Sequence, residues 1–195
     1  MEHLRHRKRM RLQGYNYSRN GAYFITICTK DRRKLLGDVV WHDASNTSLS
    51  VEIVGRDAPG APLPSGVPFL RLSKYGGIVK AAIEETPTYY HGVTIDNFVV
   101  MPNHIHMIIC IDRENGSEGA PRASRPTNAL IPNIIAALKK KTNKSCGLDM
   151  WQTSYYDHII RNEPEYLKIW QYIDENPINW MGDRYYVTGD QGRLT

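Results

Sequence analysis

The chain has 195 residues, of which 41% are hydrophobic and 23% are charged, with a net charge of +5. This length and balance are typical of one soluble globular domain and exclude collagen-like, coiled-coil and wholly disordered chains. No apolar run approaches the roughly 18–20 residues of a transmembrane helix, and no apolar stretch follows the basic N-terminus as it would in a secretory signal. The three scattered cysteines form no CxxC pair, so we expect no disulfide framework and a cytoplasmic location.

Positive charge is concentrated in residues 1–20, which hold six basic residues and one acidic residue. The totals of 25 basic and 20 acidic residues therefore leave 19 of each for the rest of the chain. A basic arm on a neutral body indicates a polyanionic partner such as nucleic acid, and a solubilising tail is the alternative. The side chains expected to contact DNA phosphates are Arg5, Arg7, Lys8, Arg9 and Arg11.

The first predicted element is a buried strand over residues 22–29, which is rich in β-branched and aromatic residues. Residues 37–72 contain short β-like pieces at 39–41 and 49–54, followed by a Gly- and Pro-rich stretch, and are expected to form an insertion or variable loop. The apolar spacing then predicts a helix over 73–85, with Ser73 as its N-cap.

Two apolar runs, 94–101 and 104–111, flank Pro102 and Asn103. Because these two residues favour turns, we expect a hairpin in the middle of a sheet. Residues 112–127 are again rich in Gly, Pro and Ser, which predicts a second variable loop.

A second amphipathic helix is predicted from residue 130, ending in three lysines whose charge suits the C-terminal end of a helix. A last strand over 151–160 and a helix over 163–176 follow, with Asn162 as the N-cap of that helix. The lysines, with Lys144, form a further candidate DNA-binding patch, for which a solvated helix end is the alternative. Arg32, Arg33 and Lys34 form a third candidate patch. The three lysines are Lys139, Lys140 and Lys141.

The predicted order is strand, helix, hairpin, helix, strand and an added helix. This is the ferredoxin-like βαββαβ order of an α+β protein, with a central antiparallel sheet and a C-terminal extension. We therefore expect a single domain over residues 21–180 and a C-terminal tail over 181–195.

His104 and His106 give the sharpest chemical signal. Residues i and i+2 of a strand point to the same face, so the two imidazoles would project side by side while Ile105 faces the other way. Two neutral imidazoles so placed can chelate a divalent metal ion. A purely structural histidine pair is the alternative.

Tyr172 and Asn176 are spaced i, i+4 on the last predicted helix, which places them on one side. Tyr172 lies off the main apolar stripe, so its hydroxyl could point into a site. Asn176 offers an amide oxygen, which suits a hard metal ion. A packing role for Tyr172, one of twelve tyrosines, is the alternative.

Three segments, in this order, resemble the single-strand tyrosine transposases. Residues 97–106 (NFVVMPNHIH) resemble their HUH motif, in which two histidines flank a bulky hydrophobic residue. Residues 151–162 (WQTSYYDHIIRN) resemble the block after the second helix of REP-associated tyrosine transposases. Residues 172–177 (YIDENP) resemble the nucleophile helix of that family. The resemblance covers residues 15–36 and 73–180.

The resemblance implies a metal-dependent endonuclease and strand transferase that acts on single-stranded hairpin or palindromic DNA through a 5′-phosphotyrosine, away from any membrane. By position, Tyr172 is the nucleophile and His104 and His106 are metal ligands. Asn176 stands where related transposases often have glutamine as third ligand. The implied ion is Mg²⁺ or Mn²⁺. His158 is a candidate accessory residue, with a structural or DNA-contacting role as the alternative.

Three other functions compete with this interpretation. A histidine-triad hydrolase would need a third histidine at position 108, where the chain has Ile108. Rolling-circle initiators and relaxases share the HUH chemistry but commonly differ in motif order or carry extra domains. A non-catalytic hairpin-DNA-binding protein could keep the same fold. The sequence also leaves open a monomer or a homodimer, with Tyr172 serving its own chain or a partner.

Overall fold

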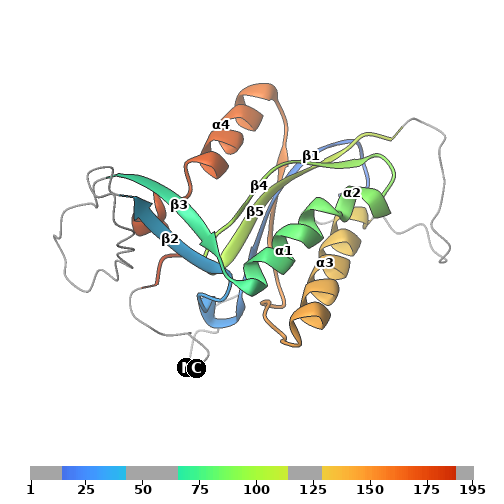
Figure 1. The fold of residues 1–195 in the computed structure, drawn as a ribbon. Coiled ribbons are helices and arrows are strands. Elements are labelled where there is room, and N and C mark those ends of the chain that lie inside the picture. The colour runs from blue at the N-terminus through green and yellow to red at the C-terminus, as the bar shows by residue number, and fades with distance from the viewer. Residues whose placement is uncertain (1–14, 43–65, 114–128, 188–195) are drawn as a thin grey trace, which may run out of the picture.

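The computed structural model describes residues 15–42, 66–113 and 129–187 (Figure 1). The basic arm up to residue 14, and with it Arg5, Arg7, Lys8, Arg9 and Arg11, lies outside the described residues, as does most of the predicted loop at 112–127. Within the described ranges, no helix has both the length and the apolar character needed to cross a membrane.

A four-stranded antiparallel sheet forms the centre of the molecule, with the spatial order β4-β5-β1-β6. The chain order around it is strand, helix, two strands, helix, strand, which confirms the expected mixed α+β fold with an antiparallel sheet. The strands are β1 (Gly21–Cys28), β4 (Val93–Val100), β5 (His104–Ile111) and β6 (Tyr156–Ile160).

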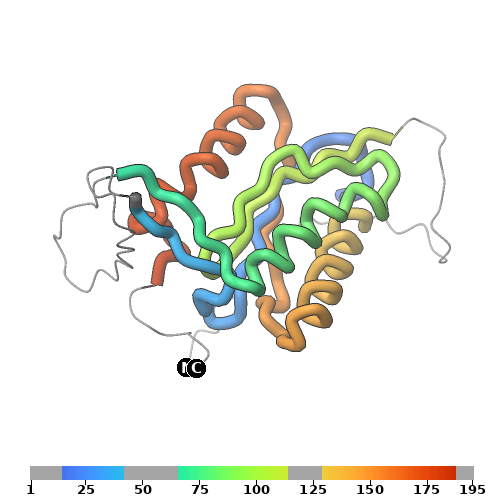
Figure 2. The backbone as a smooth tube through the Cα atoms, viewed as in Figure 1, coloured from blue at the N-terminus to red at the C-terminus, as the bar shows by residue number. Residues whose placement is uncertain are grey.

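Helices cover the two faces of this sheet unequally (Figures 1 and 2). Two long helices, α1 and α3, lie on one face with the short α2, and α4 lies on the other. The helices are α1 (Lys74–Glu84), α2 (Thr86–Tyr89), α3 (Leu130–Cys146) and α4 (Glu163–Asp174). The helical elements also include two 3₁₀ turns, η1 (Lys30–Arg32) and η2 (Trp180–Gly182).

The predicted helix starts are confirmed by their caps. The Ser73 hydroxyl accepts hydrogen bonds from the backbone N–H groups of Tyr75 and Gly76, and the Asn162 side chain accepts one from Glu165 N–H. Helix α3 continues beyond the three lysines to Cys146, where Gly147 ends it in the left-handed region with a φ of 63°.

The alternation of side chains along β1 and β5 divides the apolar residues into two clusters. On the face below α1 and α3, which we call the core face, Ile25 and Ile27 of β1 pack with Ile105 and Met107 of β5. On the opposite face, which we call the site face, Phe24 and Ile108 pack with Ile173 of α4 and Trp180 of η2.

The segment 37–72, predicted as a variable loop with a β-like piece at 39–41, has a strand at each end. Strands β2 (Gly37–His42) and β3 (Val67–Leu72) pair antiparallel as a two-stranded ribbon. Positions in β3 alternate between exposed and half-buried, so the strand buries too little apolar surface to give a strong sequence signal. Pro68, which is tolerated on an edge strand, also weakens that signal.

Hydrogen bonds through Leu36 connect the ribbon and the start of helix α1 to the turn between β4 and β5. Leu36 N–H donates to the Pro102 carbonyl, and the Leu36 carbonyl accepts from Ser73 N–H, each at 2.9 Å. A Cβ added to Gly76 would lie 1.9 Å from that same Leu36 carbonyl oxygen, so only glycine permits this approach. These contacts hold the turn that carries the first histidine.

Candidate functional site

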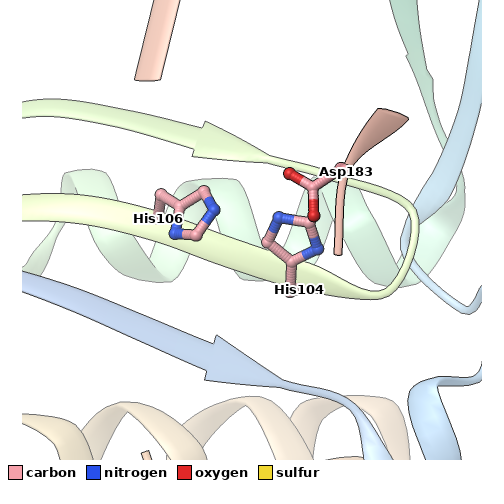
Figure 3. A group of neighbouring side chains, drawn as sticks. All are labelled: His104, His106 and Asp183. Atoms are coloured by element: carbon pink, nitrogen blue, oxygen red, sulfur yellow. The ribbon is translucent and has the colours of Figure 1, made fainter. Parts of the chain in front are cut away.

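His104 and His106 project from the beginning of β5 on the site face, side by side (Figure 3). Their ring centroids lie 4.5 Å apart, and both residues are fully buried. Ile105 and Met107 belong to the core face. The predicted same-face placement of the two imidazoles is therefore confirmed.

The orientation of His104 leaves one ring nitrogen available. Its Nδ1 lies 2.9 Å from Asn103 Oδ1, an oxygen that can only accept, so Nδ1 carries the hydrogen. The other nitrogen, Nε2, is buried and has no hydrogen-bond partner. Burial lowers the pKa of His104 to about 3, although the nearby Asn176 amide offsets part of the shift. The ring is neutral at physiological pH, which is the state that binds metal ions.

His106 is held between a threonine and a tyrosine. Its Nδ1 lies 2.8 Å from the Thr26 hydroxyl, and its Nε2 lies 3.3 Å from the Tyr172 hydroxyl. The Phe24 ring stacks on the imidazole at 5.2 Å between centroids. Burial lowers the pKa of His106 well below its ordinary value. Repulsion from the Arg184 guanidinium, and from His104 whenever that ring is protonated, acts in the same direction.

Tyr172 reaches the histidines from α4 and remains 39% exposed. Burial raises the pKa of Tyr172 to about 12, and the charge of Asp183 acts in the same direction, so the phenol is protonated at neutral pH. The tyrosine and the histidine belong to the same chain, so this structure assembles the pair within one molecule.

Polar contacts to strands β4 and β6 fix helix α4 to the sheet. Tyr166 donates to Asp96 at 2.8 Å, Asn97 donates to Asp174 at 2.9 Å, and His158 contacts Glu165 at 2.7 Å. His158 thus lies on β6 and contacts α4, outside the cluster of His104, His106 and Asp183. An accessory role for His158 remains a prediction.

Asn176 and Asp183 add oxygen atoms beside the imidazoles. Asn176 is buried, its amide nitrogen donates to Asp183 Oδ2 at 3.2 Å, and its Oδ1 has no hydrogen-bond partner. One ligand atom each from His104, His106 and Asp183 lies within 4.8 Å of the other two (Figure 3). This group could hold a metal ion, since two imidazole nitrogens with a carboxylate oxygen suit a divalent cation.

Two residues of this site were missed by sequence reasoning. Asp183 falls in the segment predicted to be a tail, and it reaches the histidines because η2 turns the chain back after α4. Asn103 was predicted only as a turn residue. Its side chain donates to the carbonyls of Arg32 and Tyr185 while its Oδ1 orients His104. The position of Asn103 directly before His104 was the sequence signal that could have indicated this role.

The three lysines proposed to contact DNA lie on α3, at the core face. Lys139 donates to the carbonyls of Gln152, Thr153 and Ser154. Lys141 pairs with Glu85, and Lys140 is exposed. The structure therefore gives Lys139 and Lys141 partners within the chain, and a DNA-contacting role for the three remains a prediction.

No protein-family model matches the chain. The chain is 32% identical over 197 residues to an uncharacterised protein of Haemophilus influenzae, a match that covers 94% of this chain and 95% of that protein. The protein therefore belongs to the same family as that bacterial protein.

The fold is also found in a solved structure. A REP-associated tyrosine transposase, solved bound to a REP hairpin, matches with a TM-score of 0.51 over 83% of this chain and 68% of that chain, at 19% identity. A second solved structure, from Deinococcus radiodurans R1, gives a TM-score of 0.40 at 16% identity over 85% of this chain and 95% of that chain. The chain has a transposase-like fold.

Proposed function

We propose that the protein is a metal-dependent single-stranded DNA endonuclease and strand transferase with Tyr172 as its nucleophile. The observation that carries this proposal is the 3.3 Å contact between the Tyr172 hydroxyl and His106 Nε2, beside the unpartnered His104 Nε2 and Asn176 Oδ1. Buried polar atoms without partners are costly, and a ligand that binds them removes that cost. A hairpin as DNA partner is supported by the transposase of the same fold that was solved with one.

The residues that would hold Mg²⁺ or Mn²⁺ are His104, His106, Asp183 and Asn176. One ligand atom each from His104, His106 and Asp183 already converges, and Asn176 lies against Asp183. The Nδ1 contacts to Asn103 and Thr26 fix both rings. A bound divalent ion would polarise a non-bridging oxygen of the scissile phosphodiester.

Tyr172 performs the substitution at phosphorus. Its phenolic oxygen forms a bond to phosphorus while the bond from phosphorus to the 3′-oxygen breaks, leaving a 5′-phosphotyrosine and, after protonation by solvent, a 3′-hydroxyl. The phenol must lose its proton, and the 39% exposure of Tyr172 lets that proton leave to solvent. Attack by a different 3′-hydroxyl reverses the step and joins two strands.

A covalent-trapping experiment tests the nucleophile. Full-length protein is mixed with single-stranded or duplex hairpin oligonucleotides, with Mn²⁺ or with EDTA, and separated on denaturing gels. We expect an adduct that requires both Mn²⁺ and a single strand, and that Tyr172→Phe abolishes. Tyr166→Phe, on the same helix but with its hydroxyl on Asp96, is the matched control and keeps the adduct.

Two outcomes would contradict the proposal. An adduct that survives in Tyr172→Phe would assign the nucleophile to another tyrosine. Clear binding without adduct on any of these oligonucleotides would favour a non-catalytic hairpin-DNA-binding protein.

The metal site is tested without DNA. Titration calorimetry with Mn²⁺ should show one site in the wild-type protein, and the heat of binding should be lost in His104→Gln and strongly reduced in Asp183→Asn. Asp149→Asn, which removes an exposed carboxylate on the loop after α3, serves as the control and should bind normally. Equal binding by all four proteins would refute this ligand set.

A further inference from the structure

An open cavity of about 290 Å³ adjoins the paired histidines on the site face. Thr26, whose hydroxyl contacts His106, lines it together with Tyr185, whose ring centroid lies 4.5 Å from that of His104. The proposed reaction uses neither the cavity nor its remaining lining, which includes Cys28, Arg32, Tyr156 and Arg184. The cavity therefore lies next to the proposed reacting atoms and needs an explanation of its own.

Two guanidinium groups line this cavity, and among the described residues neither forms an ion pair with a carboxylate. Arg184 lies over the Tyr185 ring at 4.7 Å and over the Tyr156 ring at 5.8 Å, and Arg32 lies over Tyr185 at 5.3 Å. Arg32 also donates to the Arg184 carbonyl at 2.8 Å, which ties the two segments together. Both positive charges are thus held in place at the cavity.

Planar surfaces line the same cavity. The Tyr156 ring is 36% exposed, and Tyr185 is buried against His104. Aromatic rings and arginine guanidiniums are the surfaces on which proteins stack unpaired bases. Arginine also binds phosphate through paired hydrogen bonds.

We propose that this cavity binds one unpaired nucleotide adjoining the scissile phosphodiester. Its base stacks on Tyr156 and on the Arg184 guanidinium, and its phosphate accepts hydrogen bonds from Arg32 and Arg184. The volume lies just below the roughly 300–1,000 Å³ range of pockets for whole small molecules, which suits one nucleotide rather than several. A base within a duplex cannot reach such a cavity without leaving its stack. This inference rests on the proposed function and assigns a specificity-determining subsite to it.

The test measures binding without chemistry, in Tyr172→Phe protein with EDTA. Fluorescein-labelled hairpins carry a single-stranded extension on the 5′ side, on the 3′ side or on neither. We expect Tyr156→Ala and Arg184→Gln to weaken binding of one extended hairpin by about tenfold and to leave the blunt hairpin unchanged. Tyr89→Ala is the matched control, because Tyr89 is also exposed with a cation, Lys141, over its ring, but belongs to α2 at the core face.

An abasic scan of that extension locates the base. In protein with the intact cavity, an abasic site at one position of the extension should weaken binding about tenfold. In Tyr156→Ala, which already lacks the stacking ring, the same abasic site should weaken binding almost no further. The inference would be overturned if the losses of affinity from the abasic site and from Tyr156→Ala were fully additive. It would also be overturned if the substitutions weakened binding of blunt and extended hairpins equally. Unchanged unfolding midpoints confirm that each variant is folded. Adduct formation by protein with Tyr172 intact is scored separately, so failure of the subsite and failure of the proposed function give different results.

Discussion

The two faces of the central sheet are built from the same strands but differ in chemistry and in cover. Along β5, Ile105, Met107 and Ile109 pack on the core face below α1 and α3. The alternate residues His104 and His106 lie on the site face, where α4 and η2 leave a cavity open. The face with two long helices is filled by apolar side chains, whereas the partly covered face holds polar atoms without partners.

This difference indicates how one strand can serve stability and chemistry together. Substitutions on the core face should change the free energy of unfolding most, because they remove close packing. Substitutions on the site face should change stability less and metal or DNA binding more.

The largest expected effect on stability comes from the core face. Ile105→Ala should lower the free energy of unfolding by about 2–5 kcal/mol, since it leaves a cavity in a fully buried position. Denaturant unfolding measures the change. Leu167→Ala, at a position of α4 that is 59% exposed, should change stability by less than about 0.5 kcal/mol. Similar losses in the two variants would break the distinction between packed and exposed positions.

The next effect comes from Asn103, which lies in the turn between β4 and β5. Asn103→Ala removes the donor to the Arg32 and Tyr185 carbonyls and the acceptor for His104. We expect a loss of about 1–3 kcal/mol, the usual cost of leaving buried polar groups without partners. The variant should also bind Mn²⁺ more weakly, which calorimetry would measure. Normal Mn²⁺ affinity would show that Asn103 does not orient the ring.

The site face should also give the protein a pH-dependent stability in EDTA. Burial lowers the pKa of His104 from 6.5 to about 3, so between these values the unfolded chain binds a proton that the folded chain does not. Stability therefore falls as the pH falls below 6.5, by about 1.4 kcal/mol at about pH 5.5 for His104. The lowered pKa of His106 acts in the same direction.

Denaturant unfolding across this pH range measures that slope. In His104→Gln, the free energy of unfolding should fall less steeply as the pH is lowered. Ile105→Val, a core-face change, should lower the free energy of unfolding without altering its dependence on pH. An unchanged slope in His104→Gln would contradict the assignment.

The smallest stability effect is expected for Tyr172→Phe. Its hydroxyl contacts His106 at 3.3 Å on a side chain that is 39% exposed, so the change should be about 0.5 kcal/mol or less. A thermal or denaturant melt checks this. A large loss would mean that absence of adduct in this variant cannot be assigned to chemistry.

Local rules predicted much of this structure from the sequence. The period-2 alternation of a strand placed His104 and His106 on one face, and capping chemistry placed Ser73 and Asn162 at helix starts. The helical spacing placed Tyr172 off the apolar stripe, and the structure shows its hydroxyl beside His106.

Contacts between distant segments were not predictable in this way. Asp183 reaches the histidines only because η2 reverses the chain after α4. The cavity combines Arg32, which follows β1, with Arg184 near the end of the described chain. No spacing rule connects two residues so far apart, and strand β3 was hidden by its weak apolar alternation.

The placement of Tyr172 and His106 in a single molecule has a consequence for complementation. Because one chain brings both groups to 3.3 Å, a mixture of the Tyr172→Phe and His106→Gln proteins should form no adduct. A site shared between two copies would regain activity on mixing, since each variant would supply the group that the other lacks. For the same reason, the rate of adduct formation per molecule should be unaffected by dilution of the protein.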